Sequence, residues 1–191
     1  LRGKKVKKFV TVEYRIESDK IKRPFTVVMI SDLHNVVFGE KNGQLLEKIR
    51  DLGPDFLVIA GDLVLGKPGA SFKEPEGFLK QALKIAPVFY APGNHEQRMK
   101  LYPQTYGNAY MGYEKRIQRM GVKFLENRTE MIQIKGQKVA VTGLELPYEY
   151  YLKRKQKTLE KRELTRLLGK PKKNCFQILL AHTPKYGKTY L

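Results

Sequence analysis

Apolar runs of strand length alternate with helix-length segments along the chain. Residues 25–31 (FTVVMIS) form a continuous apolar run, which predicts a central strand, and residues 56–62 (FLVIAGD) predict a second strand. Between them, residues 42–55 (NGQLLEKIRDLGPD) predict a helix that ends at a Gly-Pro pair. Apolar and polar residues alternate with period two over residues 9–16 (FVTVEYRI), which predicts an outer strand.

The strand, helix, strand pattern recurs further along the chain. Residues 75–86 (PEGFLKQALKIA) predict a helix, because their apolar side chains fall on one stripe, and residues 87–96 (PVFYAPGNHE) predict the strand that follows. Strands that alternate with helices in this way predict an α/β layered fold. The remaining pattern predicts a helix over 110–120, a strand over 122–127, a hairpin over 130–145 with Gly136-Gln137 at its turn, a basic helix over 158–168 and a strand over 175–182.

The length of 191 residues and the apolar content of 41% predict one folded domain over residues 1–191. No apolar run approaches the roughly 18 to 20 residues that cross a bilayer. Cys175 is the only cysteine, which excludes an internal disulfide and a cysteine-based zinc site. Its apolar neighbours place it at the start of a buried strand.

Both ends of the chain suggest a piece of a longer protein. The chain begins with Leu1, and its basic segment 1–8 (LRGKKVKK) is of the kind found beside a membrane anchor or left by processing. The other end stops at Leu191 without a closing element. We therefore expect membrane association through a segment that precedes Leu1, with simple boundaries at both ends as the alternative.

The charge of the chain is strongly positive. Lysine and arginine total 37 against 19 aspartates and glutamates, a formal net charge of +18. Such a field attracts anions, whether phosphorylated metabolites, nucleic acid or an anionic membrane surface. The net charge alone does not distinguish among these partners. The basic residues do not alternate regularly with aromatic ones, so a nucleic-acid groove is not indicated.

Four predicted strands end in polar residues, with the sequences SDLH, AGD, PGNHE and AHTP. Taken alone, Asp32 and His34 could simply share a solvated face, because residues i and i+2 of a strand point the same way. However, ligands of open α/β sheets bind where the carboxyl ends of strands converge, and all three histidines lie at such ends. The pattern therefore predicts a metal site built from Asp32, His34, Asp62, Asn94, His95 and His182.

The ligand types indicate which metals would bind. Carboxylate, amide and imidazole groups suit divalent first-row transition ions better than calcium or a thiolate-bound zinc. Asp62 offers two oxygens and could bridge two cations roughly 3.5 to 4 Å apart, which would clamp a phosphoryl group and lower the pKa of a bridging water. Hydrolysis of a phosphate ester is the predicted chemistry.

In this order and on these strands, the four motifs resemble those of the calcineurin-like metallophosphoesterases. The resemblance covers residues 25–184, and GNHE after a strand with an upstream GD is its most specific part. Within that family the chain is most similar to bacterial single-domain enzymes that a membrane anchor or export signal often precedes. The resemblance implies a layered α/β/β/α sandwich with mixed sheets and two divalent ions, with Mn, Fe or Zn expected.

The resemblance also implies a role for each candidate residue. By it, Asp62 bridges both metals, Asp32 and His34 bind one of them, and Asn94 and His182 bind the other. His95 is then no ligand. Together with Asn94 it contacts the substrate phosphate, and it protonates the leaving oxygen, for which a histidine beside a metal ligand is well placed.

Gly93 and Glu96 lie directly beside these residues in the sequence. Gly93 is expected to supply the backbone freedom that a tight loop needs. Glu96 either orients His95 or is only a charge at a helix start, and the sequence leaves both interpretations open.

The chain departs from the family pattern in one respect. Family members carry a fifth motif, Gly-His-x-His, whose histidines complete the two metal shells, and nothing after His182 supplies it. The C-terminal part of the sandwich is therefore expected to be missing, and each metal would keep three protein ligands. We expect this chain alone to bind metal weakly and to have little activity, and the longer natural protein to be the enzyme.

Two function classes remain. The first is a metal-dependent phosphoesterase acting on a phosphomonoester, phosphodiester or pyrophosphate, with a lipid-linked or nucleotide substrate compatible with the basic surface. The second is a noncatalytic anion-binding module for nucleic acid or membrane headgroups that retains the fold. The candidate ligands favour the first. Tyrosines near 102–113 and in the segment 143–155 either contact the substrate or pack neighbouring helices.

Overall fold

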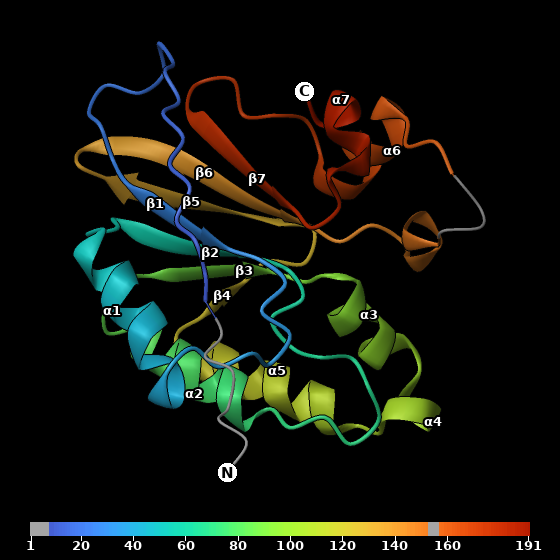
Figure 1. Ribbon diagram of the computed structural model, residues 1–191. Helices are drawn as coiled ribbons and strands as arrows, with labels where there is room; N and C mark the ends of the chain where they lie inside the picture. Colours follow the sequence, from blue (N-terminus) through green and yellow to red (C-terminus); the bar gives the residue numbers. More distant parts are fainter. Residues whose placement is uncertain (1–7, 153–156) are drawn as a thin grey trace.

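Two β-sheets pack face to face in the computed structural model, and helices lie on the outer side of each sheet (Figure 1). The structure describes residues 8–152 and 157–191, so the expected basic segment 1–8 lies outside the described residues except for Lys8. The α/β/β/α arrangement confirms the predicted layered fold. One sheet is mixed, as predicted, whereas the other is wholly parallel.

The parallel sheet has the order β1-β2-β3-β4. Its two middle strands are buried along their whole length. The prediction of a central strand over residues 25–31 is therefore wrong, because β1 lies at the edge and its Met29 is 65% exposed. The run is apolar because Val28 packs on the helix side of the sheet and Val27 packs toward the second sheet. The strands are β1 (Val27–Ile30), β2 (Phe56–Ala60), β3 (Val88–Ala91) and β4 (Lys123–Phe124).

The second sheet contains the predicted hairpin. Its strands are β5 (Arg128–Ile134), β6 (Gln137–Leu144) and β7 (Phe176–Ala181), with β7 parallel to β6. The hairpin is confirmed, but its turn is Lys135-Gly136 and not Gly136-Gln137. Both turn residues have positive φ, 47° and 78°, as the type I′ turns that suit the twist of a hairpin require.

Helices α1, α2 and α5 cover the parallel sheet, and α6 and α7 lie beside the second sheet (Figure 1). The sequence did not predict α3 and α4, because the polar segment NHEQRMKL shows no clear apolar stripe. None of the helices among the described residues has both the length and the apolar composition to cross a membrane. The α-helices are α1 (Gly43–Asp51), α2 (Lys73–Ala82), α3 (Asn94–Leu101), α4 (Pro103–Tyr106), α5 (Ala109–Arg119), α6 (Lys161–Leu168) and α7 (Gly187–Tyr190), and the 3-10 helices are η1 (Glu40–Asn42), η2 (Tyr148–Tyr151) and η3 (Pro184–Tyr186).

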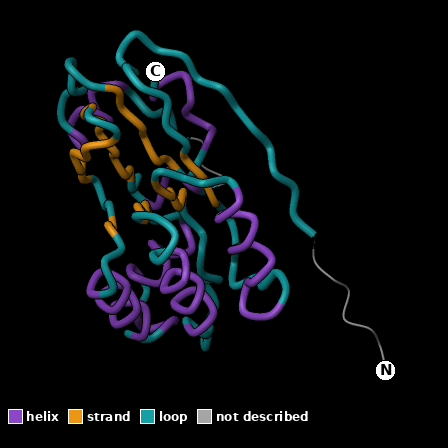
Figure 2. The backbone as a smooth tube through the Cα atoms, turned by 90° about the vertical axis from the view of Figure 1, so that its left-hand side faces the viewer, coloured by secondary structure: helices purple, strands orange, loops and turns teal. Residues whose placement is uncertain are grey.

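Residues 9–16 form no strand. They run as loop along the outside of the molecule (Figure 2). Phe9 packs against Phe38, with ring centroids 5.1 Å apart, but the alternate side chains that follow are exposed, including Tyr14 at 81%. The prediction of an outer strand here is wrong, because a period-two pattern becomes a strand only where a neighbour pairs with it, and within the described residues this segment has none.

Two apolar layers hold the strands in place. Leu57 and Ile59 of β2 face the helices, whereas Phe56 and Val58 face the second sheet. All four side chains are at most 2% exposed, and each such burial stabilises the fold by about 1.5 to 3 kcal/mol. The strands therefore form a rigid frame. The loops that leave β1, β2 and β3 at their carboxyl ends start from one edge of this frame.

Candidate metal centre

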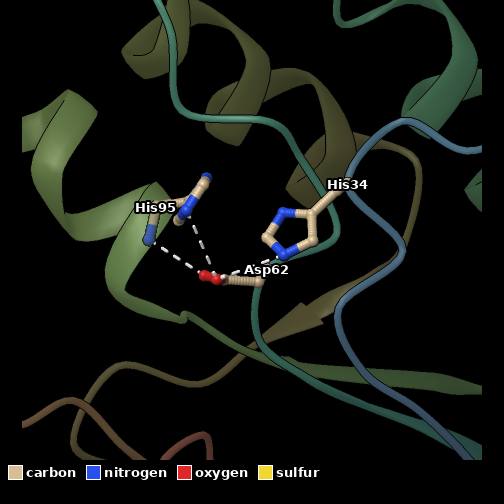
Figure 3. Close-up of side chains that lie close together, drawn as sticks. All are labelled: His34, Asp62 and His95. Carbon is tan, nitrogen blue, oxygen red and sulfur yellow. Dashed lines mark hydrogen bonds and ion pairs between the residues drawn. The ribbon is translucent and has the colours of Figure 1, made fainter.

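The loops at this edge, together with the loop after β7 of the second sheet, bring the predicted site residues together. Asp62 follows β2 and lies at the centre of the group. Its Oδ2 atom is 3.7 Å from His34 Nε2, 3.8 Å from His95 Nε2 and 3.4 Å from His182 Nε2. Figure 3 shows His34, from the loop after β1, and His95, from the first turn of α3, on either side of this carboxylate.

The two remaining candidates complete the group. Asp32 Oδ1 lies 3.6 Å from His34 Nε2, and Asn94 Oδ1 lies 3.0 Å from His182 Nε2. The titratable members form two sets whose ligand atoms all lie within 4.8 Å of one another. These sets are His34, Asp62 and His95, and Asp32, Asp62 and His182, so that Asp62 belongs to both.

The backbone of the site loops is strained. Asp32, His34 and Asp62 all have positive φ, between 47° and 56°, which costs about 1 to 3 kcal/mol for each non-glycine residue. Hydrogen bonds from Asp32 N–H to the Gly61 carbonyl (3.1 Å) and from His34 N–H to the Asp62 carbonyl (3.0 Å) extend the pairing of β1 and β2 into these loops. The sheet thus fixes the unusual conformation, and strain retained at such a position is typical of functional sites.

Two glycines allow Asp62 its position. A Cβ atom on Gly93 would lie 2.2 Å from Asp62 Oδ1, and one on Gly61 would lie 2.6 Å from Gly93 Cα. Gly93 has φ −100°, which any residue adopts. The expectation that Gly93 supplies backbone freedom is therefore wrong, because it supplies the space against which the Asp62 carboxylate lies.

Asp62 is ionised despite its burial. Its side chain is 4% exposed, and burial acts to raise its pKa. The hydrogen bonds and charges of His182 and His95 outweigh burial and lower the pKa of Asp62 overall. The backbone N–H of His95 donates to Oδ1 at 2.9 Å, which leaves Oδ2 facing the three imidazoles. A buried carboxylate of this kind is a strong site for cations.

His182 presents one nitrogen to Asp62. Its Nδ1 lies 2.9 Å from the Ala60 carbonyl oxygen and donates to it, which directs Nε2 toward Asp62 and Asn94. Burial lowers the pKa of His182, but the hydrogen bond and charge of Asp62, with the Ala60 carbonyl, outweigh burial and raise it to about 9. In the metal-free protein a proton therefore occupies the nitrogen that a metal would need.

Metal binding should depend on pH as a consequence. A metal takes the neutral ring, so it must displace the His182 proton below the pKa of about 9. The affinity for Mn²⁺ is expected to rise by up to about tenfold per pH unit between roughly pH 6.5 and pH 8.5. Isothermal titration calorimetry at several pH values measures this slope. A flat slope in the unsubstituted protein, or the same slope in His182→Gln, would contradict the assignment.

His95 is oriented by the loop that follows β2. The backbone N–H of Gly66 donates to His95 Nδ1 at 2.9 Å, so the neutral ring keeps its proton on Nε2, which faces Asp62. Arg98 Nη2 donates to the Gly66 carbonyl at 2.5 Å and holds this loop. Burial lowers the pKa of His95, although the charge of Asp62 opposes this.

Glu96 has a role that the sequence did not reveal. It is 0% exposed and contacts the backbone around the ligands, not His95. Its Oε2 accepts hydrogen bonds from the N–H groups of Asp62 and Gly93, both at 2.9 Å. Its Oε1 accepts from Val64 N–H (3.2 Å) and Tyr90 Oη–H (2.6 Å). Burial and the charge of Asp62 raise the pKa of Glu96 to about 7. One carboxylate thus ties the β2 loop to the β3 loop.

Substitution of Glu96 should weaken metal binding. Glu96→Gln keeps only one of the two acceptor oxygens, so an amide N–H₂ must face either the N–H groups of Asp62 and Gly93 or the N–H of Val64 and the Tyr90 hydroxyl. Loss of such outer contacts typically costs about 10- to 100-fold in metal affinity, and we expect that loss for Mn²⁺, measured by calorimetry. Tyr90→Phe is the matched control, because it removes a single donor and should change the affinity less than about threefold. Unchanged affinity in Glu96→Gln would contradict this role.

The geometry of the cluster fits a divalent cation. The separation of 3.7 Å between Asp62 Oδ2 and His34 Nε2 is too long for a hydrogen bond, and the 3.4 Å between Asp62 Oδ2 and His182 Nε2 makes a long one. Two ligand atoms each about 2.1 Å from one metal lie roughly 3.0 to 3.4 Å apart, which is close to these values. His34 Nδ1 is also buried with no hydrogen-bond partner among the described residues. The donor set therefore fits first-row transition ions.

Four tyrosines of the two segments that the sequence left open lie in two different places. Tyr110 and Tyr113 are at most 2% exposed and pack in the helix layer, as the packing alternative predicts. Tyr150 and Tyr151 of η2 instead line a cavity that also includes Asp32, Asn94 and His182. The sequence left the position of these two open.

Comparisons with known proteins are consistent with this geometry. Residues 25–191 match the family model described as calcineurin-like phosphoesterase. No protein of curated function matches the chain. Among solved structures, a phosphopantetheinyl hydrolase from Mycobacterium tuberculosis is similar at 26% identity, over 65% of this chain and 44% of its own, with a TM-score of 0.45. The chain thus spans less than half the length of that protein.

Proposed function

The chain belongs to the calcineurin-like phosphoesterase family, and from this premise we propose that it is a dinuclear metal-dependent phosphohydrolase. The observation that carries the proposal is the buried Asp62 carboxylate, which belongs to both sets of ligand atoms. A single carboxylate shared by two sets is what a pair of cations requires.

The proposed ligand sets differ from the two sets above, because Asp32 joins His34, Asn94 joins His182, and His95 is left out as the acid, as the resemblance to the family implies. Asp32, His34 and Asp62 would hold one ion, and Asp62 with Asn94 and His182 would hold the other. Mn, Fe or Zn suits these donors. When bound, two such ions neutralise the charge of the phosphoryl group and increase the acidity of water.

The side chains would then carry out distinct tasks. Asn94 and His95 lie beside the ligand atoms and would contact the phosphate. Water attacks phosphorus and loses a proton to solvent, while the bond from phosphorus to the leaving oxygen breaks. To protonate that oxygen, His95 must first carry a proton on both ring nitrogens, which gives up the Gly66 hydrogen bond to Nδ1. The imidazolium then passes its Nε2 proton to the leaving oxygen and returns to the neutral ring, whose Nδ1 again accepts from Gly66 N–H.

Metal dependence of hydrolysis tests the proposal. The full-length protein is treated with a chelator and assayed with p-nitrophenyl phosphate and bis(p-nitrophenyl) phosphate, with and without added Mn²⁺. We expect Mn²⁺ to raise the rate at least about tenfold for one of the two substrates, which also distinguishes a monoesterase from a diesterase. Equal rates of hydrolysis with chelator and with Mn²⁺ would contradict the proposed metal-dependent activity and would favour a noncatalytic anion-binding module.

A further inference from the structure

A cavity of about 600 Å³ opens beside the proposed metal ligands. Part of its wall is Asp32, Asn94 and His182, and the rest comes from residues that the proposed chemistry does not use. A molecule whose phosphoryl group lies at the metal ligands would place its remaining atoms in this cavity. The other lining residues are Tyr150, Tyr151, Leu152, Thr183, Pro184 and Lys185.

The wall beside His182 is aromatic. The Tyr151 ring lies 6.2 Å from the His182 ring at an interplanar angle of 44°. Leu152, which is 39% exposed, extends the apolar surface. This part of the wall is suited to an apolar or aromatic group, whereas Thr183 and Lys185 make another part of it polar.

The wall is also anchored. Tyr186 is buried and packs edge-on against Tyr150, with ring centroids 5.7 Å apart at 84°. Its hydroxyl donates to the Tyr150 carbonyl at 3.1 Å. Because η2 is fixed to the segment after β7 in this way, the cavity is formed before any substrate binds, and ligand binding needs little ordering of the protein.

The size of the cavity selects among substrates. Pockets of roughly 300 to 1,000 Å³ typically hold small organic molecules. Inorganic pyrophosphate has no apolar part and would leave Tyr151 and Leu152 without a partner. We propose that the cavity binds the organic group of the substrate, and that this group is aromatic or apolar next to the phosphate. The inference rests on the proposed function and narrows its substrate to organic phosphate esters.

Two phosphonates that differ only in their organic group test this inference. Binding of phenylphosphonate and of methylphosphonate to the Mn²⁺-loaded protein is measured by calorimetry. Phenylphosphonate is expected to bind at least about tenfold more tightly, because its ring buries apolar area against Tyr151. Tyr151→Ala should reduce this preference to about threefold or less, whereas Tyr151→Phe retains the ring and should keep it.

The outcomes separate the inference from the function on which it rests. Equal binding of the two phosphonates, or an undiminished preference in Tyr151→Ala, overturns the inference and leaves the proposed function intact. Binding of neither phosphonate in the presence of Mn²⁺ overturns both. Circular dichroism checks that Tyr151→Ala folds. Leu152→Ala, on the exposed part of the same wall, is the second variant, and it should lower the preference in the same direction.

Discussion

Asp62→Asn is expected to abolish metal-dependent hydrolysis, lowering the rate roughly 10³-fold or more. An amide keeps the shape of the side chain but removes the buried negative charge that both sets of ligand atoms share. The ions would supply several kcal/mol of transition-state stabilisation, and each 1.36 kcal/mol corresponds to about tenfold in rate. Initial rates of hydrolysis with Mn²⁺ measure the loss of activity, and calorimetry measures the loss of Mn²⁺ affinity.

Asp55→Asn provides the matched control. Asp55 directly precedes the first residue of β2, at the end of the strand away from Asp62. There it accepts a hydrogen bond from Thr26 N–H and forms an ion pair with Lys135. Asp55→Asn changes the net charge by the same amount as Asp62→Asn. The rate of hydrolysis is expected to stay within about twofold of that of the unsubstituted protein, because a partly exposed ion pair contributes little to stability. Equal rates of hydrolysis in Asp62→Asn and the unsubstituted protein would contradict the proposed phosphohydrolase activity.

His95→Gln is expected to lower hydrolysis by about 10²- to 10⁴-fold while Mn²⁺ affinity changes little, because a general acid contributes about that much to the rate. Glutamine can still accept the Gly66 hydrogen bond, but it has no proton to give to a leaving oxygen. The rate of hydrolysis in the presence of Mn²⁺ and the affinity for Mn²⁺ are measured on the same preparation.

The leaving group identifies the mechanism of this loss. A poor leaving group, phenol, needs a proton more than p-nitrophenol does, so the defect of His95→Gln should be larger for phenyl phosphate than for p-nitrophenyl phosphate. Equal defects for the two substrates, accompanied by weaker Mn²⁺ binding, would indicate that His95 is a metal ligand and not an acid.

The sequence was informative about the site because most of its residues follow strands of one parallel sheet, with His182 added from the end of β7 in the second sheet. Strands β1, β2 and β3 are parallel, so the loops after Ile30, Ala60 and Ala91 must start side by side. A short motif after each strand is therefore enough to predict that Asp62 lies near His34 and His95. The distances follow from the fold and not from the individual motifs.

The parts that the sequence did not predict depend on contacts between distant residues. The sequence left Glu96 open between orienting His95 and being only a charge at a helix start. Nothing in the order of residues shows that four donors, from Asp62, Val64, Tyr90 and Gly93, meet at its carboxylate. The orientation of His95 likewise depends on the N–H of Gly66, which carries no side-chain signal. Burial and backbone donors are properties of the folded chain.

The errors in the fold have a similar origin. The apolar run of β1 reads like that of β2, yet β1 lies at the edge, because sheet order is set by which strand pairs with which. Residues 9–16 alternate as a strand does but have no pairing neighbour among the residues that the structure describes. Periodicity reports which faces are apolar, and it does not report strand partners.

Electron paramagnetic resonance of the protein titrated with Mn²⁺ tests most directly whether the Asp62 carboxylate is shared by two cations. Two Mn²⁺ ions that share a ligand interact magnetically, so the account predicts the spectrum of a coupled pair near saturation, and its loss in Asp62→Asn. A spectrum of isolated Mn²⁺ ions only, at saturating metal, would contradict it.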